Sequence, residues 1–254
     1  MAYVYGIHAV DSLLRRNPEQ VQALWLQAGR NDKRITALET LARNQGVAVS
    51  RAGRAQLDER VNGRHQGAVA ETNPDAAAAE VAGGNLWSEA QLLERVASAT
   101  PPPLLLVLDG VTDPHNLGAC LRSADAAGAT AVVVPKDKAA GLTAVVRKVA
   151  CGAAEAVPFV QVTNLSRTLQ ALKAQGVWLF GAAGDAENTV YDSELTGPTA
   201  LVLGAEGSGL RRLTRENCDI LVRLPMAGTV SSLNVSVAAG ICLFEAVRQR
   251  AEVG

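Results

Sequence analysis

The chain has 254 residues, of which 48% are apolar and 19% are charged, and its formal net charge is −1. A chain of this size and composition can bury a core without disulfides or a structural metal. It contains no apolar run of the about eighteen residues that a membrane helix needs. Residues 1–6 have neither the basic nor the apolar part of a secretory signal. We therefore expect a globular, cytoplasmic protein that has no membrane partner.

Residues 1–71 alternate between helical and extended patterns. The spacing of the apolar residues predicts helices over 7–15 and 32–45, the second of which ends before Gly46. Short apolar runs predict strands over 22–26, 47–49 and 66–70. These elements indicate a small α/β domain.

A linker is predicted over residues 72–100. Asn73-Pro74-Asp75 is a turn signal, Gly83-Gly84 lacks packing side chains, and the three prolines 101–103 stiffen the chain. Within this linker, residues 86–98 are predicted to form one helix.

From residue 101 to 254, apolar strands alternate with helices. Strands are predicted over 104–108, 131–134, 156–160, 177–181, 200–203 and 220–224. Helices are predicted over 116–128, 141–151, 164–175 and 233–250. Continuous apolar strands between helices indicate a parallel sheet that is covered on both faces. Because ligands of such sheets bind beyond the carboxyl ends of the strands, functional residues are expected there.

Charge and cysteine usage constrain the partners. Residues 1–70 hold ten Lys and Arg against six Asp and Glu, whereas residues 71–100 hold one against five. This basic front segment favours RNA despite the near-zero total, although a solvated surface would show the same excess. No metal is expected, because a zinc site needs closely spaced ligand pairs. The four cysteines are widely separated and are expected to be reduced and largely buried: Cys120, Cys151, Cys218 and Cys242.

Three segments that follow strands carry candidate functional residues. Residues 109–122 contain Asn116 and Arg122, for which a helix N-cap and a surface charge are the ordinary alternatives. Residues 201–210 place three glycines around Glu206, in a spacing that matches neither a dinucleotide fingerprint nor a Walker loop. A glycine turn with an exposed glutamate is the ordinary alternative there.

The third segment, 224–236, has the strongest physical signal. It crowds four polar side chains at the start of a long apolar helix: Ser231, Ser232, Asn234 and Ser236. A helix N-cap needs only one of them. The surplus of hydrogen-bonding groups therefore indicates a ligand site.

Together the three segments resemble the motifs of the SpoU family of RNA ribose methyltransferases, within the SPOUT group. The resemblance rests on Asn116 and Arg122, on Gly204-Ala205-Glu206-Gly207, and on Pro225-Met226 followed by 232–236. It extends to the front domain through residues 5–10 and 65–67. It covers nearly the whole chain and is weakest in the linker.

The resemblance implies a fold, a reaction and partners. The fold would be a carboxyl-terminal, trefoil-knotted parallel-sheet domain over 101–254, with a small ribosomal-protein-like RNA-binding domain in front. The reaction would be 2′-O-methylation of a guanosine ribose in the peptidyl-transferase loop of 23S rRNA, with S-adenosyl-L-methionine as methyl donor. The protein would be a homodimer through the knot domain. The donor contacts would fall on Leu203, Gly204, Leu224, Met226 and Leu233.

The catalytic residues implied by the resemblance are Asn116, Arg122, Glu206, Ser232 and Asn234. Arg122 would lie nearest the reacting hydroxyl, but the pKa of arginine above about 12 argues against a proton acceptor. We expect it to act as an electrostatic partner. In the front domain, four arginines are candidates for phosphate contacts, with ordinary solvated side chains as the alternative: Arg51, Arg54, Arg60 and Arg64.

The missing phosphate loop counts against a generic α/β nucleotide enzyme, and two other functions stay open at this point. One is a tRNA ribose 2′-O-methyltransferase, against which the additional front domain argues. The other is a non-catalytic rRNA-binding factor of ribosome assembly, which would have no need of all four polar residues Asn116, Arg122, Glu206 and Asn234.

Overall fold

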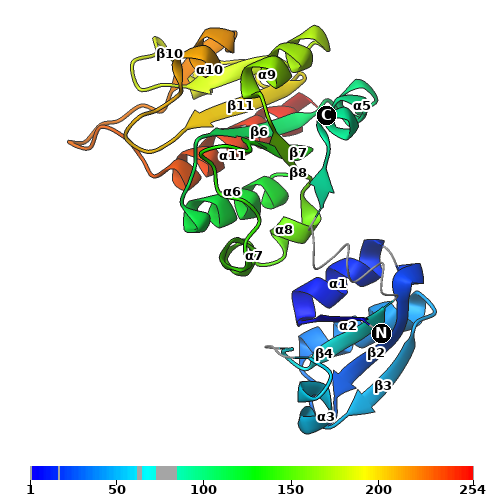
Figure 1. Ribbon diagram of the computed structural model, residues 1–254. Helices are drawn as coiled ribbons and strands as arrows, with labels where there is room; N and C mark the ends of the chain where they lie inside the picture. The colour runs from blue at the N-terminus through cyan, green and yellow to red at the C-terminus, as the bar shows by residue number, and fades with distance from the viewer. Residues whose placement is uncertain (1, 17, 62–64, 73–84, 254) are drawn as a thin grey trace. The chain divides into compact units, whose positions relative to one another are not determined.

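The computed structural model describes residues 2–16, 18–61, 65–72 and 85–253 (Figure 1). The chain divides into two compact units, Met1–Gly84 and Asn85–Gly254, called unit 1 and unit 2 below. Residues 73–84 of the expected linker lie outside the described residues. Residues 85–100 belong to unit 2, and the position of the linker stays a prediction.

Unit 1 is a four-stranded sheet with helices. The strand order is β1-β4-β2-β3, in which β2 and β3 are parallel and the other neighbours antiparallel. The strands are β1 (Ala2–Tyr5), β2 (Val21–Gln27), β3 (Ala48–Ala52) and β4 (Ala68–Thr72). The helices are α1 (Ile7–Arg16), η1 (Pro18–Gln20), α2 (Lys33–Asn44) and α3 (Arg54–Asp58).

The alternation of side chains along β2 gives unit 1 two unequal cores. Leu24 and Leu26 are fully buried in the larger cluster, to which α1 and α2 contribute. Trp25 points to the opposite face, as the period of a strand requires. There it packs with Tyr3 against a small cluster that includes Leu57 of α3.

Unit 2 is built on an eight-stranded sheet whose neighbours are all parallel. The strand order is β10-β12-β9-β11-β6-β7-β8-β5. The strands are β5 (Leu86–Trp87), β6 (Leu104–Asp109), β7 (Ala131–Pro135), β8 (Phe159–Val162), β9 (Trp178–Ala182), β10 (Asn188–Thr189), β11 (Thr199–Gly204) and β12 (Ile220–Arg223).

Helices cover both faces of this sheet. One apolar cluster takes residues from α6, α7, α8 and α11, and a second takes residues from α5 and α9. The helices are α5 (Glu89–Ala97), α6 (Pro114–Ala126), α7 (Ala144–Ala150), α8 (Ala153–Ala156), α9 (Leu165–Ala174), η2 (Val190–Asp192), α10 (Arg212–Asn217) and α11 (Val235–Val253). The predicted parallel α/β sheet is confirmed, and the trefoil knot stays a prediction.

Three predicted elements differ from the structure, one of which is the helix expected over 141–151, which begins only at Ala144 because Thr143 is its N-cap. The helix expected over 86–98 is a short strand, β5, followed by α5, because Ser88 and Gln91 form a capping box that starts the helix at Glu89. The strand expected over 156–160 begins only at Phe159. Ala156, the first residue of the expected strand, is instead the last residue of the short helix α8, in keeping with the high helix propensity of alanine.

The strand order sets the place of a site. β11 lies between β6 and β9, and β12 lies on the other side of β9. The carboxyl ends of β9, β11 and β12 therefore lie side by side at one edge of the sheet. This is where ligands of parallel sheets bind.

Arg250 fastens the end of α11 to the start of the sheet. Its guanidinium donates hydrogen bonds to the carbonyl oxygens of Pro102, Pro103, Leu195 and Gly197, at 2.6–3.1 Å. Burial lowers the pKa of this guanidinium, but arginine stays protonated in proteins.

Substitution of Arg250 by alanine should remove these bonds and leave several carbonyl oxygens without their donor. We expect the free energy of unfolding to fall by about 3 kcal/mol. Arg212→Ala is the matched control, because within the described part of the chain Arg212 pairs only with exposed Glu216, and its loss should cost less than about 1 kcal/mol. Equal urea midpoints for the two variants would contradict the anchoring role of Arg250.

Candidate functional site

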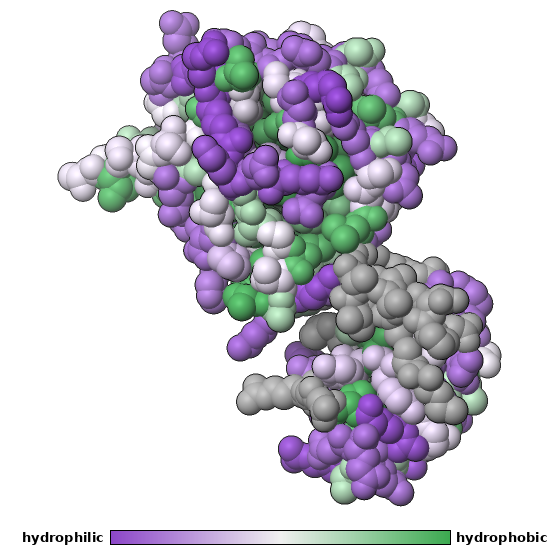
Figure 2. Space-filling view, viewed as in Figure 1, coloured by the Kyte–Doolittle hydropathy of each residue, from purple (hydrophilic) through white to green (hydrophobic). Residues whose placement is uncertain are grey.

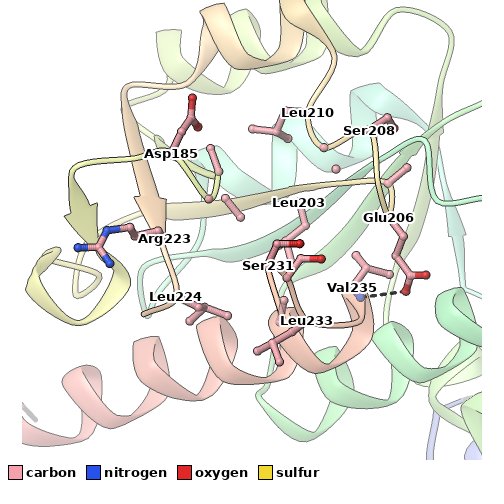
Figure 3. Close-up of a pocket in the computed structure, with 18 of the residues that line it drawn as sticks. Asp185, Leu203, Glu206, Ser208, Leu210, Arg223, Leu224, Ser231, Leu233 and Val235 are labelled. Atoms are coloured by element: carbon pink, nitrogen blue, oxygen red, sulfur yellow. Dashed lines mark hydrogen bonds between the residues drawn. The ribbon is translucent and has the colours of Figure 1, made fainter. Parts of the chain in front are cut away.

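A pocket of about 650 Å³ lies at the carboxyl ends of β9, β11 and β12, and the segment before α11 closes it (Figure 3). All five residues predicted to bind the methyl donor line it: Leu203, Gly204, Leu224, Met226 and Leu233. In Figure 3, Leu203 and Ser231 lie in the middle of the pocket and Leu233 lies below them next to α11, while Glu206 and Asp185 lie on opposite sides. The lining therefore combines apolar side chains and a serine hydroxyl at its centre with carboxylates at its margins.

The wall after β11 can be built only with glycine at position 204. A Cβ on Gly204 would lie 2.0 Å from the backbone carbon of Gly209. The loop closes on itself through a hydrogen bond from the Gly209 N–H to the Ala205 carbonyl, 2.9 Å long. Gly207 has a φ of +79° and Gly209 one of +64°, in the region that favours glycine. The turn presents Glu206 at its exposed tip.

Glu206 joins the three segments that the sequence singled out. Its Oε1 accepts hydrogen bonds from Asn116 Nδ2 (3.1 Å), Asn234 Nδ2 (2.6 Å) and the backbone N–H of Val235 (3.2 Å). Asn234 Nδ2 also donates to Asn116 Oδ1 at 2.9 Å. We call Asn116, Glu206 and Asn234 the polar cluster. Among the described residues, Oε2 of Glu206 accepts no hydrogen bond, so this oxygen can bind a ligand hydroxyl.

Helix geometry explains how two members of the polar cluster are presented. Asp113, not Asn116, is the N-cap of α6 and accepts a bond from the His115 N–H at 2.9 Å, which leaves the Asn116 amide to the cluster. Asn234 precedes α11, and its Oδ1 accepts from the Ser236 N–H at 2.9 Å. The Glu206 carboxylate thus lies at the positive end of the α11 dipole.

The other two predicted catalytic residues are placed differently. Ser232 is exposed and lines the pocket. Arg122 lies further along α6 and is exposed, and its Nη1 lies 3.9 Å from Cys151 Sγ. It does not line the pocket of this chain. The structure therefore brings Asn116, Glu206 and Asn234 together but leaves Arg122 outside the polar cluster.

Asp109 is a residue of the site region that the sequence reasoning did not single out. It ends β6, is 1% exposed, and accepts a hydrogen bond from the Arg211 N–H at 2.9 Å. Its other oxygen lies 3.4 Å from Arg211 Nε. This ion pair ties the end of the glycine turn to the neighbouring strand. A charged residue at the end of the wholly buried strand β6 is the signal that could have revealed it.

A second ion pair lies at the margin of the pocket. Arg215 and Asp185, which both line it, pair through two hydrogen bonds of 2.9 and 3.0 Å. The hydrogen bond from Arg215 holds the pKa of the Asp185 carboxyl below its ordinary value. With Asp185 paired in this way, Glu206 is the acidic group of the pocket that is available to a ligand.

The cysteines give no sign of metal chemistry. All four are free thiols, and no group of three or more His, Cys, Asp and Glu that could hold a metal ion occurs among the described residues. Burial raises the pKa of Cys120 and Cys242 to about 12, so both stay protonated. Cys151, in contrast to the expectation, is exposed. Among all the residues that the structure describes, no helix is long and apolar enough to span a membrane.

Both units match families of known proteins. Residues 103–244 match the SpoU rRNA Methylase family. Residues 3–77 match a second family model, described as RNA 2′-O ribose methyltransferase substrate binding. The chain belongs to the SpoU rRNA methylase family.

Curated relatives are similar to this chain over nearly the whole length of both proteins. It is 59% identical to the 23S rRNA (guanosine-2′-O-)-methyltransferase RlmB of Pseudomonas syringae pv. tomato, over 97% of this chain and 95% of the relative. It is 56% identical to RlmB of Escherichia coli K12, over 97% and 98%. The SpoU methyltransferase AviRb from Streptomyces viridochromogenes, solved with AdoMet, superposes with a TM-score of 0.68 at 26% identity, covering 98% of this chain and 90% of AviRb.

The packing around the glycine turn predicts a graded series of stabilities. Gly204→Ala should lower the free energy of unfolding by about 3 kcal/mol, because its Cβ would overlap backbone that cannot yield. Gly207→Ala has open space but a positive φ, and should cost about 1 kcal/mol. Gly228→Ala has neither constraint and should change the value by less than about 0.5 kcal/mol. Urea unfolding that gives any other order would contradict this description of the turn.

Proposed function

We propose that the protein transfers a methyl group from S-adenosyl-L-methionine to the ribose 2′-hydroxyl of a guanosine in 23S rRNA. The observation that carries this proposal is the convergence of Asn116, Glu206 and Asn234 at the edge of the pocket. The activities printed for the relatives of matching length support the reaction and the substrate. The AdoMet complex of AviRb supports the donor.

The pocket fits the methyl donor. Its volume of about 650 Å³ lies within the range of about 300–1,000 Å³ that is usual for small-molecule sites. Leu203, Leu224 and Leu233 offer apolar contact to the donor. Gly204 and Met226 complete the set of residues that would hold it. The bound donor would supply a methyl group that is attached to a good leaving group, so its transfer needs no metal.

The polar cluster would position the ribose. Oε1 of Glu206 accepts three hydrogen bonds, which restrain the carboxylate and leave Oε2 to accept a bond from a ribose hydroxyl. Asn116 of α6 and Asn234, which directly precedes α11, hold the carboxylate, and Ser232 adds a hydroxyl to the pocket lining. Such alignment is worth several kcal/mol in a reaction between two bound groups. The polar cluster would therefore act mainly by orienting the nucleophile.

Arg122 would act as a cation and not as a base. Its guanidinium stays protonated, so it would stabilise the oxyanion character of the attacking hydroxyl or a neighbouring phosphate. In one chain it lies outside the pocket, which is compatible with contact to the RNA and not to the donor.

A homodimer through unit 2 is part of the proposal. Val237 and Phe244 of α11 are both about half exposed. They are seven residues apart and so lie on one face of the helix. An exposed apolar helix face of this kind is a candidate interface, and a second copy of the chain is the partner that the family resemblance indicates.

Unit 1 would bind the RNA. The reaction would take place in the cytoplasm, because bacteria such as those that contain the relatives make their rRNA there.

The two alternative functions have less support. The relatives that match both units carry a 23S rRNA activity, which disfavours a tRNA substrate. A non-catalytic assembly factor would not need a hydrogen-bonded carboxylate at the mouth of a pocket of this size.

Glu206→Gln should preserve the shape of the side chain but weaken its bonds to three donors. We expect kcat for rRNA methylation to fall by about 10²–10³, while the Kd for the methyl donor in calorimetry changes much less. Glu216→Gln, on the exposed face of α10, is the matched control and should leave both values unchanged. A Glu206→Gln enzyme with the kcat of the wild type would remove Glu206 from the proposed machinery.

Arg122→Lys tests whether the planar guanidinium is needed. Lysine keeps the charge but lacks the fork that contacts two oxygens, so kcat should fall by about tenfold or more. Single-turnover methylation at saturating donor gives the rate. Near wild-type turnover would show that only a positive charge is required at this position.

The dimer proposal predicts that Phe244→Glu yields monomers in analytical ultracentrifugation, because a charge would be buried in the interface. Trp178→Glu changes an equally exposed apolar residue at the start of β9 and should leave the dimer intact. Dimers of the Phe244→Glu protein at micromolar concentration would place the interface elsewhere.

A further inference from the structure

Unit 1 has a pocket of its own, of about 350 Å³, at the end of its sheet where β2 and β3 finish and β4 begins. Figure 1 shows α3 at this end, and Figure 2 shows mostly hydrophilic side chains there. The pocket is lined from three segments, namely the end of β2 with its turn, α3, and the turn before β4: Gln27, Arg30, Arg54, Asp58, His65, Gln66 and Gly67.

A buried histidine orients the carboxylate of this pocket. His65 is 5% exposed, and its Nδ1 accepts a hydrogen bond from the Gly67 N–H at 2.9 Å. The ring proton is therefore on Nε2, which donates to Asp58 Oδ1 at 3.0 Å. The Asp58 side chain is itself 55% exposed, and its Oδ2 lies 3.8 Å from Arg54 Nε. The second oxygen of Asp58 is thus held toward solvent and the pocket.

The turn before β4 is shaped for this arrangement. Gln66 has a φ of +50° and Gly67 one of +82°. A left-handed conformation is unfavourable for a residue with a side chain, and such residues gather at binding sites. A Cβ on Gly67 would lie 3.1 Å from Arg30 Nη1, and the Arg30 guanidinium donates to the Gln66 carbonyl. Arg30 is therefore part of the wall, whereas Arg54, with 77% of its side chain exposed, is available to a ligand.

The chemistry of the lining distinguishes between two parts of an RNA ligand. A phosphate offers only acceptors, and the fixed carboxylate of Asp58 would repel it. The edge of a nucleobase offers both donors and acceptors, which suit a carboxylate beside a guanidinium. Proteins read single-stranded RNA through unstacked bases of this kind.

We propose that this pocket binds one unstacked nucleobase of the RNA substrate, with Asp58 accepting hydrogen bonds from its N–H groups and Arg54 donating to its carbonyl or ring nitrogen. The inference rests on the proposed function, because it takes RNA as the ligand of unit 1. It assigns to Arg54 a base contact in place of the phosphate contact considered above.

The sign of the effect of Asp58→Asn tests the proposal. The substitution removes a negative charge, which strengthens RNA binding if the pocket contacts only phosphate. If Asp58 accepts bonds from a base, the same substitution should weaken the binding of a 23S rRNA fragment by about tenfold. Asp11→Asn is the matched control, because Asp11 pairs with Arg15 at the same spacing on α1, outside the pocket. It should leave the Kd nearly unchanged.

A second measurement locates the base and does not depend on Asp58. In a scan with abasic substitutions at the unpaired positions of the fragment, one position should weaken the binding of wild-type protein about tenfold and have almost no effect on Arg54→Ala. Arg15→Ala should respond like wild type.

Tighter or equal binding by folded Asp58→Asn, or an abasic scan in which no position differs between wild type and Arg54→Ala, would overturn the nucleobase pocket. These results are separable from the proposed function. That function fails if the wild-type protein does not methylate the fragment at all.

Discussion

The hydrogen bonds to one carboxylate, that of Glu206, join three separate segments of the chain beside the pocket. Its Oε1 is reached by an amide from α6, an amide from the residue before α11 and the first N–H of α11 itself. Asn116 is 90 residues away in sequence and Asn234 is 28 residues away. Without the carboxylate, the glycine turn would lose these hydrogen bonds to Asn116, to Asn234 and to the start of α11.

This arrangement depends on two features beneath it. The first is the order of the parallel strands, which brings the ends of β9, β11 and β12 to one edge. The second is the tight contact of Gly204 with Gly209, which folds the turn back and directs Glu206 toward α11. Asp109, buried at the end of β6, then fixes the far end of the same turn through Arg211. The stability of the pocket wall and the orientation of the polar cluster thus come from the same backbone.

The sequence predicted the class of the fold and the three segments of the site, because both depend on local patterns. Continuous apolar strands indicate a buried parallel sheet, and a polar surplus at Ser231–Ser236 needs no tertiary information. The partnership of Asn116 with Glu206 could not be predicted, since it depends on which strand lies between which others. The same holds for the ion pair of Asp109 with Arg211, and for the unit 1 pocket, where His65 and Asp58 meet only after the chain folds.

Arg122 shows a different limit. Family resemblance places it among the catalytic residues, yet in one chain it lies beside Cys151 and not in the polar cluster. Its contribution would require the RNA, a second copy of the chain, or both. In the proposed division of roles, unit 2 would align donor and ribose, and unit 1 would capture the RNA.

The most direct test is to incubate purified protein with S-adenosyl-L-methionine and unmodified 23S rRNA, and to map methyl groups by reverse-transcription stops at low nucleotide concentration. We expect one donor-dependent 2′-O-methyl group, on a guanosine, that is lost with Glu206→Gln while donor binding remains. A methyl group on a base, on tRNA in place of 23S rRNA, or at full level with Glu206→Gln would contradict it.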